Sequence, residues 1–223
     1  MEMPVDLGTG AAPILEPGVV YEMIATVFLG DVVNTSPLGI TYRPPFLISK
    51  LYPPLRTLDM ISAGARYMVV SACSDPRIYV DTLFDRPPPK GYGTAILPGV
   101  GPVPLPRGCY RHWVCRAEHL LWGGLYYTLY CRPIAFLEGD SFPKPYTRAF
   151  GALIEALVCL TRVRPFYLLG DVEKAVENAR CVTRNLAIAR RLGNELYRSL
   201  AIEVKNALEN VLRSLGADLE PIA

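Results

Sequence analysis

The hydrophobic pattern changes period along the chain: it alternates in steps of two over the first two thirds and recurs near every 3.6 residues in the last third. Runs of β-branched and aromatic residues, separated by glycine, proline and aspartate, predict strands in the first part. Gly30-Asp31 and Gly123-Gly124 are typical of hairpin turns, so we expect a mostly antiparallel sheet. The expected strands cover residues 19–29, 32–42, 46–52, 66–73, 109–122 and 125–137.

Two short helices are expected among these strands, at residues 57–63 and 77–84. Gly64 is expected to end the first helix. The second helix has a strong start signal, because Asp75 can accept hydrogen bonds from first-turn amides and Pro76 lacks only an amide that would be unpaired there.

Three long helices are expected in the last third of the chain. The first covers residues 146–164, and Pro165 is expected to end it. Asp171 is expected to cap the second helix. Gly193-Asn194 is expected to separate the second helix from the third, so that these two form an αα-hairpin.

This order of elements predicts an α+β fold that is mainly antiparallel β. A β domain is expected over residues 18–140 and a C-terminal helical subdomain over residues 146–216. Residues 1–17 are expected to be an irregular lead-in. Residues 85–108 are rich in proline and glycine, and we expect them to form a long irregular loop, which in a compact domain is usually functional or flexible.

Composition excludes several classes of protein. With 51% hydrophobic residues and a net charge of +2 over 223 residues, the chain is too apolar and too weakly charged to be disordered, and it has no basic run typical of nucleic-acid binding. The chain begins without the basic and apolar segments of a signal peptide, and no apolar stretch approaches the ~18 residues that span a bilayer. We therefore expect a soluble, cytoplasmic protein with neither nucleic acid nor membrane as a partner.

Six cysteines are scattered without a C-x-x-C pair. They are expected to be reduced core residues in an ordinary cytosol, whereas intracellular disulfides occur in hyperthermophiles, and the sequence leaves both open. Their positions are Cys73, Cys109, Cys115, Cys131, Cys159 and Cys181.

Four residues have the types of a zinc site, namely Cys109, His112, Cys115 and His119. In a strand, however, positions 109 and 115 share one face while 112 lies on the other. We therefore expect partly buried cysteines and surface histidines rather than a metal site. The chain has no recognisable Ser-His-Asp motif, no G-x-G-x-x-G motif and no Walker loop, so neither hydrolysis nor these two nucleotide sites are indicated.

A small polar segment lies inside the second expected strand, and we expect it to interrupt that strand. One interpretation is an edge strand, because proline cannot donate a hydrogen bond to a central ladder. The other is a stretch of backbone freed from pairing, whose amides and hydroxyls could bind a planar polar ligand such as a flavin ring. The segment is Asn34-Thr35-Ser36-Pro37-Leu38-Gly39.

Lys50, Arg56 and Thr57 follow this segment and supply two cations and a hydroxyl beside an expected helix N-terminus. Such a combination could hold a phosphate through charge and unpaired amides, although these residues are also common on surfaces.

Arg148, Glu155 and Arg162 are charged residues spaced by seven on an otherwise apolar helix, so they project from nearly the same side. One interpretation is a solvated stripe. The other is a stripe that meets a partner subunit or a ligand cleft, where the charges must be compensated.

Four segments together resemble successive motifs of one largely archaeal family of unknown physiological role. They are residues 18–26, 34–39, 66–76 and 148–162, and the last, with its E-A-x-x-x-x-T-R pattern, is the most specific. The similarity covers about residues 18–200. Members of that family have an FMN-binding split β-barrel followed by a C-terminal helical extension.

The resemblance implies an FMN-binding homodimer with each flavin held near the subunit interface. Residues of the polar segment would line the flavin ring, and Thr57 with Arg56 or Lys50 would hold the phosphate. The residues expected at the FMN site are Asn34, Thr35, Ser36, Pro37, Gly39, Lys50, Arg56, Thr57 and Ser71.

Two positions depart from the family pattern: Met60 and Ser71 stand where the family usually has asparagine. The resemblance implies a flavin-dependent oxidoreductase or electron-transfer protein of unknown substrate. No side chain is an obvious general acid or base, and Tyr42, Tyr52 and His112 are the candidates. The alternative is a non-catalytic split-barrel dimer that binds flavin weakly or not at all, which the two lost amides favour and which Lys50, Arg56 and Thr57 oppose.

Overall fold

The computed structural model describes residues 15–216, so most of the lead-in expected over residues 1–17 lies outside the described residues. The chain divides into two compact units, with the division between Pro143 and Lys144.

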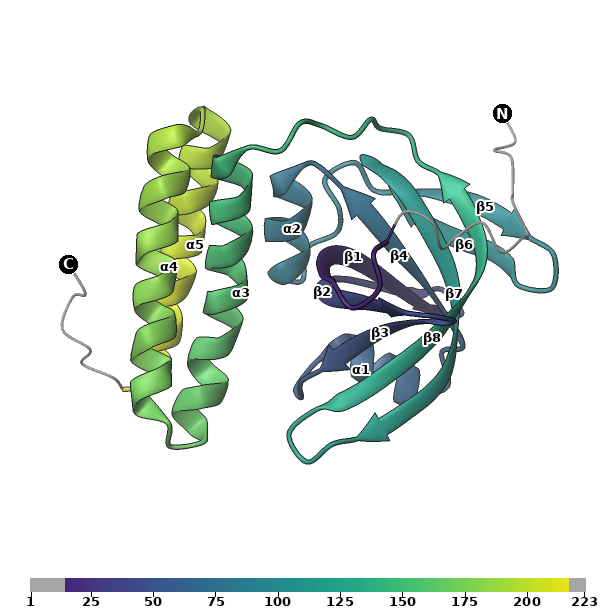
Figure 1. Cartoon of the computed structure of the whole chain (residues 1–223), viewed down its shortest axis with the longest axis horizontal. Coiled ribbons are helices and arrows are strands. Elements are labelled where there is room, and N and C mark those ends of the chain that lie inside the picture. The colour runs from purple at the N-terminus through teal and green to yellow at the C-terminus, as the bar shows by residue number, and fades with distance from the viewer. Residues whose placement is uncertain (1–14, 217–223) are drawn as a thin grey trace. The chain divides into compact units, whose positions relative to one another are not determined.

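The first unit is built on a closed barrel of six antiparallel strands in the order β1-β2-β3-β8-β7-β4 (Figure 1). All six strands expected from the sequence are present. Gly30 and Asp31 form the two-residue connection between β1 and β2. Gly30 has a φ of 58°, at which an L side chain would be strained. The strands are β1 (Val20–Leu29), β2 (Val32–Arg43), β3 (Phe46–Leu51), β4 (Tyr67–Cys73), β7 (Cys109–Trp122) and β8 (Tyr127–Glu138).

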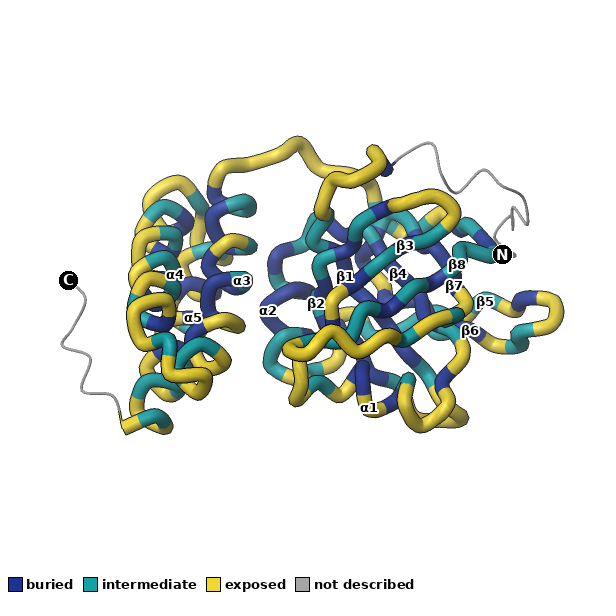
Figure 2. Tube along the Cα trace, turned by 60° about the horizontal axis from the view of Figure 1, so that its bottom comes forward, coloured by how far each residue is buried: buried dark blue, intermediate teal, exposed yellow. Residues whose placement is uncertain are grey.

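Some barrel strands carry apolar residues on both faces, because one face packs inside the barrel and the other packs against a second hydrophobic cluster. On β4, Met68 and Val70 belong to the cluster that fills the barrel interior, whereas Val69, between them, belongs to a second cluster outside the barrel. The period of two along a strand produces this division. Figure 2 shows the result, with buried residues running through the strands and exposed residues at the connections between them.

Two short helices accompany the barrel, α1 (Arg56–Ser62) and α2 (Pro76–Leu83). Leu58 and Met60 of α1 are buried in the interior cluster of the barrel. The Asp75 carboxylate accepts a hydrogen bond of 3.0 Å from the Arg77 amide, which confirms the expected cap of α2.

The expectation of an irregular loop over residues 85–108 is wrong for half of that segment. It contains a separate antiparallel pair, β5 (Tyr92–Leu97) and β6 (Gly101–Pro106). Three prolines alternate along β6, and in an antiparallel pair alternate N–H groups point away from the partner strand, so proline at those positions removes no ladder bond. The residues between the prolines, Val103 and Leu105, are buried in the cluster outside the barrel.

The second unit consists of three helices, α3 (Arg148–Leu168), α4 (Val172–Leu192) and α5 (Glu195–Ser214). Asp171 caps α4 as expected, accepting a hydrogen bond of 3.2 Å from the Lys174 amide. Asn194 occupies the N-cap position of α5, but its side chain makes no capping hydrogen bond.

Pro165 does not end α3, contrary to expectation. It lies inside the helix, at the start of the last turn, which ends at Leu168. A proline there removes only one helical hydrogen bond, and because Pro165 is exposed, water can satisfy the carbonyl that loses its partner. The helix continues, with the Leu169 amide donating to the Pro165 carbonyl at 3.1 Å.

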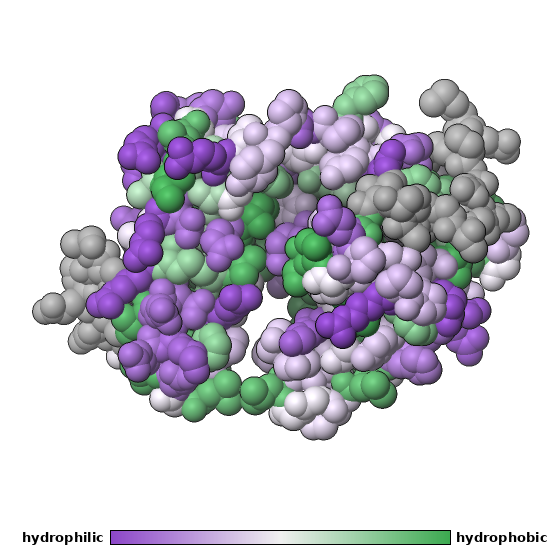
Figure 3. Space-filling view, viewed as in Figure 1, coloured by the Kyte–Doolittle hydropathy of each residue, from purple (hydrophilic) through white to green (hydrophobic). Residues whose placement is uncertain are grey.

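The three charged residues spaced by seven on α3, Arg148, Glu155 and Arg162, are all exposed, and so is Arg164. Hydrophilic residues dominate the face of the helical unit turned to the viewer in Figure 3, with hydrophobic residues between them. Within residues 15–216, no helix is long and apolar enough to cross a membrane.

Candidate functional site

The polar segment of β2 does not interrupt the strand, contrary to expectation. Every residue from Val32 to Thr41 has a partner on β1, including Pro37, which lies opposite Ile24. On its other side β2 pairs with β3 only from Ile40 onward. The first part of β2 is therefore paired on one side in the described sheet, which agrees with the edge interpretation of the proline.

Because the segment is a continuous strand, its side chains alternate between two environments. Asn34 and Ser36 point with Leu38 toward the interior side, where α1 lies. The Asn34 amide donates to the Thr57 hydroxyl at 3.0 Å, and the Ser36 and Thr57 hydroxyls share a hydrogen bond of 2.8 Å. All three polar residues are buried, so Thr57 joins the start of α1 to β2.

Thr35 points to the opposite face of β2. Its hydroxyl shares a hydrogen bond of 3.0 Å with Thr26, its direct partner on β1, and one of 2.8 Å with Tyr92 on β5. Partial burial raises the pKa of the Tyr92 phenol above its ordinary value of 10.0, which the hydrogen bond to Thr35 opposes. Tyr92 therefore carries its proton at neutral pH.

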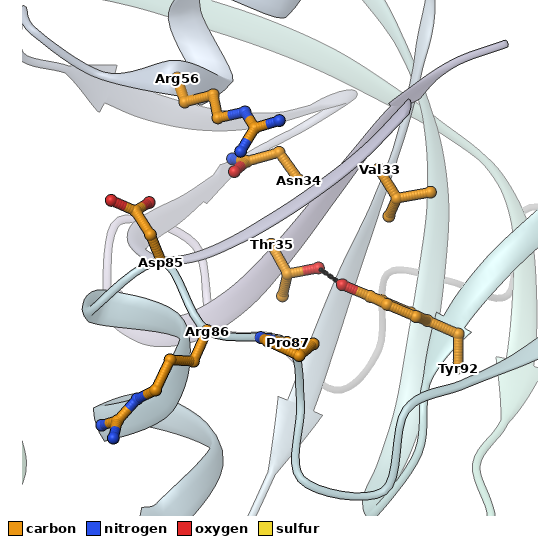
Figure 4. Close-up of a pocket in the computed structure, with 8 residues that line it drawn as sticks. All are labelled: Val33, Asn34, Thr35, Arg56, Asp85, Arg86, Pro87 and Tyr92. Carbon is orange, nitrogen blue, oxygen red and sulfur yellow. Dashed lines mark hydrogen bonds between the residues drawn. The ribbon is translucent and has the colours of Figure 1, made fainter. Parts of the chain in front are cut away.

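A pocket of about 170 Å³ opens beside these groups. Figure 4 shows its lining side chains arriving from β2, the start of α1, the segment after α2, and β5. They supply two guanidinium groups, an amide, two hydroxyls and a carboxylate, beside the apolar side chains of a valine and a proline. The lining residues are Val33, Asn34, Thr35, Arg56, Asp85, Arg86, Pro87 and Tyr92.

The two arginines of the pocket are in different electrostatic states. Arg86 is paired with buried Asp81, nitrogen to oxygen at 3.0 Å, and Asp81 also pairs with Arg77 at 3.0 Å. Figure 4 shows the Arg86 side chain directed away from Thr35 and Tyr92. Arg56 is exposed and makes no ion pair with any residue in the described part of the chain. The cationic charge available to a ligand is therefore that of Arg56.

Asp85 has a backbone φ of 56°, a conformation that aspartate tolerates better than most residues. It directly precedes Arg86, whose amide donates to the Asp81 carbonyl at 2.9 Å. This bond and the Arg86–Asp81 ion pair fix the turn that places the Asp85 carboxylate at the pocket.

Of the nine residues expected at the FMN site, three line this pocket: Asn34, Thr35 and Arg56. Ser36 and Thr57 lie directly behind it through their hydrogen bonds to one another and to Asn34. The remaining four do not line it: Pro37, Gly39, Lys50 and Ser71.

Two of these four have other contacts that explain their positions. Lys50 is exposed, and its ammonium lies 4.5 Å from the centre of the Tyr126 ring. The Ser71 hydroxyl shares a buried hydrogen bond of 2.8 Å with Nδ1 of His112.

The positions that depart from the family pattern are both away from the pocket lining. Met60 packs in the apolar interior of the barrel, and Ser71 is bonded to His112. Neither substitution removes a side chain from the pocket described here.

The three acid or base candidates do not line the pocket either. Tyr42 is buried in the barrel cluster, and Tyr52 is exposed against Tyr126, with their ring centres 5.2 Å apart. His112 is buried, which corrects the expectation of a surface histidine at that position. Burial lowers its pKa to about 4 despite nearby Asp140.

Sequence reasoning missed the pocket residues that follow α2, chiefly Asp85 and Tyr92. Both lie in the segment expected to be an irregular loop. The alternation of proline with Val103 and Leu105 was the signal for a strand pair that would bring Tyr92 against the barrel.

The cysteine pairing separates the four residues of the candidate zinc pattern. Cys109 forms a disulfide with Cys73, its opposite residue on β4, and Cys115 is a buried free thiol. His119 is exposed, as expected. Of the four, Cys109 is held in the disulfide and His112 is hydrogen-bonded to Ser71.

Replacing Thr57 by valine is expected to destabilise the barrel by about 1–3 kcal/mol, because the buried Asn34 amide and the Ser36 hydroxyl would both lose a partner. Thr57→Ser keeps the hydroxyl and serves as the matched control. Urea unfolding followed by tryptophan fluorescence measures this, since both tryptophans, Trp113 and Trp122, lie in the barrel unit. Equal destabilisation by the two variants would contradict the bonding role.

A sequence model of the N-terminal domain of DUF447, a family of proteins of unknown function, matches residues 21–135. No curated protein matches the chain significantly.

Among solved structures, an FMN-bound protein of Methanosarcina mazei from the same family aligns with a TM-score of 0.70 at 20% identity, covering 86% of this chain and 96% of that protein. This likeness confirms the expected split-barrel fold. An FMN-binding protein of Thermus thermophilus has a TM-score of 0.44 at 18% identity, over 62% of this chain and 83% of its own. An NADH:FAD oxidoreductase of Streptomyces globisporus has a TM-score of 0.42 at 16% identity, over 58% and 82%.

Proposed function

Because the chain belongs to the DUF447 family, and its pocket lies on a fold that a family member uses with FMN bound, we propose that it is an FMN-binding flavoprotein. The observation that carries this proposal is the exposed Arg56, which makes no ion pair within residues 15–216 and lies beside a buried array of amide and hydroxyl groups. With FMN binding we propose an oxidoreductase or electron-transfer role.

Arg56 suits an anionic group of the ligand. A guanidinium binds phosphate through two parallel hydrogen bonds, and Arg56 makes no ion pair with a carboxylate of the described residues. It begins α1, which Thr57 anchors to β2 through the bonds to Asn34 and Ser36. The phosphate-binding residue is therefore held by a buried polar network rather than by a free loop.

The other pocket groups suit the neutral, hydrogen-bonding parts of FMN. Thr35 and Tyr92 offer hydroxyls, Asn34 offers an amide, and Asp85 accepts hydrogen bonds. The isoalloxazine ring supplies the redox chemistry when it is bound. The Tyr92 phenol, protonated at neutral pH and bonded to Thr35, is positioned to donate a hydrogen bond or a proton at the pocket.

The pocket is too small to enclose a whole cofactor. At about 170 Å³ it is below the roughly 300–1,000 Å³ typical of ligand sites. We propose that a second copy of the chain completes the site, so that the protein is a homodimer and part of each flavin is bound by both subunits. Sedimentation equilibrium with and without FMN tests this, and a monomer in both conditions would contradict it.

The alternative remains a split-barrel protein that binds flavin weakly and has no catalytic role. The visible spectrum of the purified protein separates the two. Flavin absorbance that survives dialysis, or a colourless protein that binds added FMN stoichiometrically, supports the proposal. A colourless protein that leaves the spectrum of added FMN unchanged would overturn it.

A further inference from the structure

The helical unit contains a cluster of potential metal ligands that the proposed flavin site does not use. Cys159 on α3 forms a disulfide with Cys181 on α4, and their Cα atoms are 6.1 Å apart. Glu155 lies one helical turn before Cys159. Residues at positions i and i+4 share a helix face, so the carboxylate and the bridge lie together.

The ligand atoms of these three residues are close enough for one ion. The Glu155 carboxylate oxygen and the two sulfurs all lie within 4.8 Å of one another, and Glu155 Oε1 is 3.8 Å from Cys159 Sγ. In a tetrahedral zinc site with Zn–S near 2.3 Å and Zn–O near 2.1 Å, neighbouring ligand atoms are roughly 3.5–3.8 Å apart. The distance between the Glu155 carboxylate oxygen and Cys159 Sγ is therefore already that of two ligands of one zinc ion.

A fourth side chain, Asn185, is placed to stabilise a thiolate at Cys181 once the bridge is reduced. The Asn185 amide nitrogen lies 3.4 Å from Cys181 Sγ and donates to the Cys181 carbonyl at 3.0 Å. An N–H donor aimed at sulfur favours the thiolate over the thiol, and such outer contacts orient metal ligands. The burial of the three ligand residues is graded: Cys159 is buried, Cys181 is half-buried and Glu155 is exposed, so an ion can enter from solvent.

We propose that reduction of the Cys159–Cys181 bridge creates a site for a thiophilic divalent cation such as Zn²⁺, with Cys159, Cys181 and Glu155 as ligands. Two thiolates and one carboxylate form a soft set that selects zinc-like metals over Mg²⁺ or Ca²⁺. Three protein ligands leave a fourth position for water.

Formation of the metal site takes two steps: a two-electron reduction of the disulfide, and then replacement of the two thiol protons by the metal ion. A dithiol reductant gives two electrons and two protons to the bridge, becoming a disulfide itself while the protein gains two thiols. The cation then displaces both thiol protons and also binds the Glu155 carboxylate. The α3–α4 cross-link is thus covalent under oxidising conditions and metal-mediated under reducing conditions.

Cobalt(II) titration of the full-length protein tests the site, because Co²⁺ bound to thiolates gives a charge-transfer absorption. Protein reduced with a dithiol and freed of it under anaerobic conditions is expected to bind one equivalent, which Zn²⁺ displaces. Cys181→Ser is expected to lose the absorption, and Glu155→Gln to raise the Co²⁺ dissociation constant at least tenfold. The double variant Cys73→Ser/Cys109→Ser removes the other bridge and is expected to keep the signal.

Several outcomes would overturn the proposal. They are the same cobalt absorption in the oxidised protein, its persistence in Cys181→Ser, its loss in the control double variant, or no stoichiometric binding by the reduced protein. Glu155→Gln keeps the bridge and replaces only an exposed side chain, so it remains informative if the cysteine variant does not fold. An unchanged dissociation constant in Glu155→Gln would remove the carboxylate from the ligand set.

Discussion

Acidification from pH 6.5 to pH 4 is expected to lower the free energy of unfolding of the barrel by about 3 kcal/mol through His112, whose pKa falls from 6.5 to about 4 on folding. His112 is almost fully buried on β7 and bonded to Ser71. Burial disfavours its charged form, and the attraction of Asp140 offsets this only in part.

The direction of the effect follows from proton binding. In the unfolded chain this histidine takes up a proton near pH 6.5, whereas in the folded protein it does so only near pH 4. Between these values the unfolded state binds more protons, so the stability contributed by neutral His112 is complete above pH 6.5 and falls as the pH falls. Below pH 4 this group causes no further loss.

His112→Asn isolates this contribution. Asparagine offers Ser71 a hydrogen-bonding partner but cannot take up a proton in this range. Urea unfolding at a series of pH values, followed by tryptophan fluorescence, is expected to show the steeper decline only in the wild type. Parallel declines in both proteins would show that other groups control acid stability between pH 6.5 and pH 4.

Glu118 acts mainly below this range, and because the wild type and His112→Asn both contain it, its effect cancels in their comparison. Hydrogen bonds from Arg132 and Arg116 lower its pKa to about 2 from an ordinary value of 4.5. Its stabilising contribution is therefore present above pH 4.5 and is lost as the pH falls from there toward 2.

Removal of the Cys73–Cys109 disulfide is expected to destabilise the barrel unit by about 2–4 kcal/mol, because the bridge closes a loop between residues 36 apart in sequence. The closed segment carries α2 and the β5–β6 pair, and with them Asp85, Arg86, Pro87 and Tyr92 of the pocket. Losing the bridge is therefore also expected to weaken binding of a ligand in that pocket.

The double variant Cys73→Ala/Cys109→Ala gives the measurement, and Cys159→Ala/Cys181→Ala is the matched control. The control removes a disulfide from the helical unit, which contains no tryptophan, so the fluorescence transition is expected to move only in the first variant. A barrel transition that is unchanged by the loss of Cys73 and Cys109 would contradict the role given to their bridge.

The barrel strands were predictable because their signals are local. Alternating apolar residues and glycine-containing turns define β1, β2, β7 and β8 within their own sequence. The β5–β6 pair could not be predicted in this way, because proline usually predicts a break in a strand, although alternate proline positions face away from the partner strand. The end of α3 could not be predicted from Pro165 for a related reason, since the cost of a proline depends on its place in the helix and on solvent exposure.

The candidate site was only partly predictable. Asn34, Thr35 and Arg56 could be singled out by residue type, but the strand's alternation separates Thr35 from Asn34 and Ser36. Tyr92 and Thr35 are 57 residues apart in sequence, so no local pattern predicts the hydrogen bond between them. Lys50 could not be distinguished from Arg56 by sequence, since its stacking on Tyr126 depends on the β3–β8 pairing.

FMN titration of the wild type, Arg56→Ala and Lys50→Ala tests the central claim most directly, with quenching of flavin fluorescence as the signal. We expect the wild type to bind FMN. Arg56→Ala is expected to raise the dissociation constant about tenfold or more, as loss of a charged hydrogen bond worth ~1.5–3 kcal/mol implies. Lys50→Ala is expected to leave it unchanged. Absence of binding in the wild type, or an effect of Lys50→Ala without one of Arg56→Ala, would contradict the assignment of this pocket to FMN.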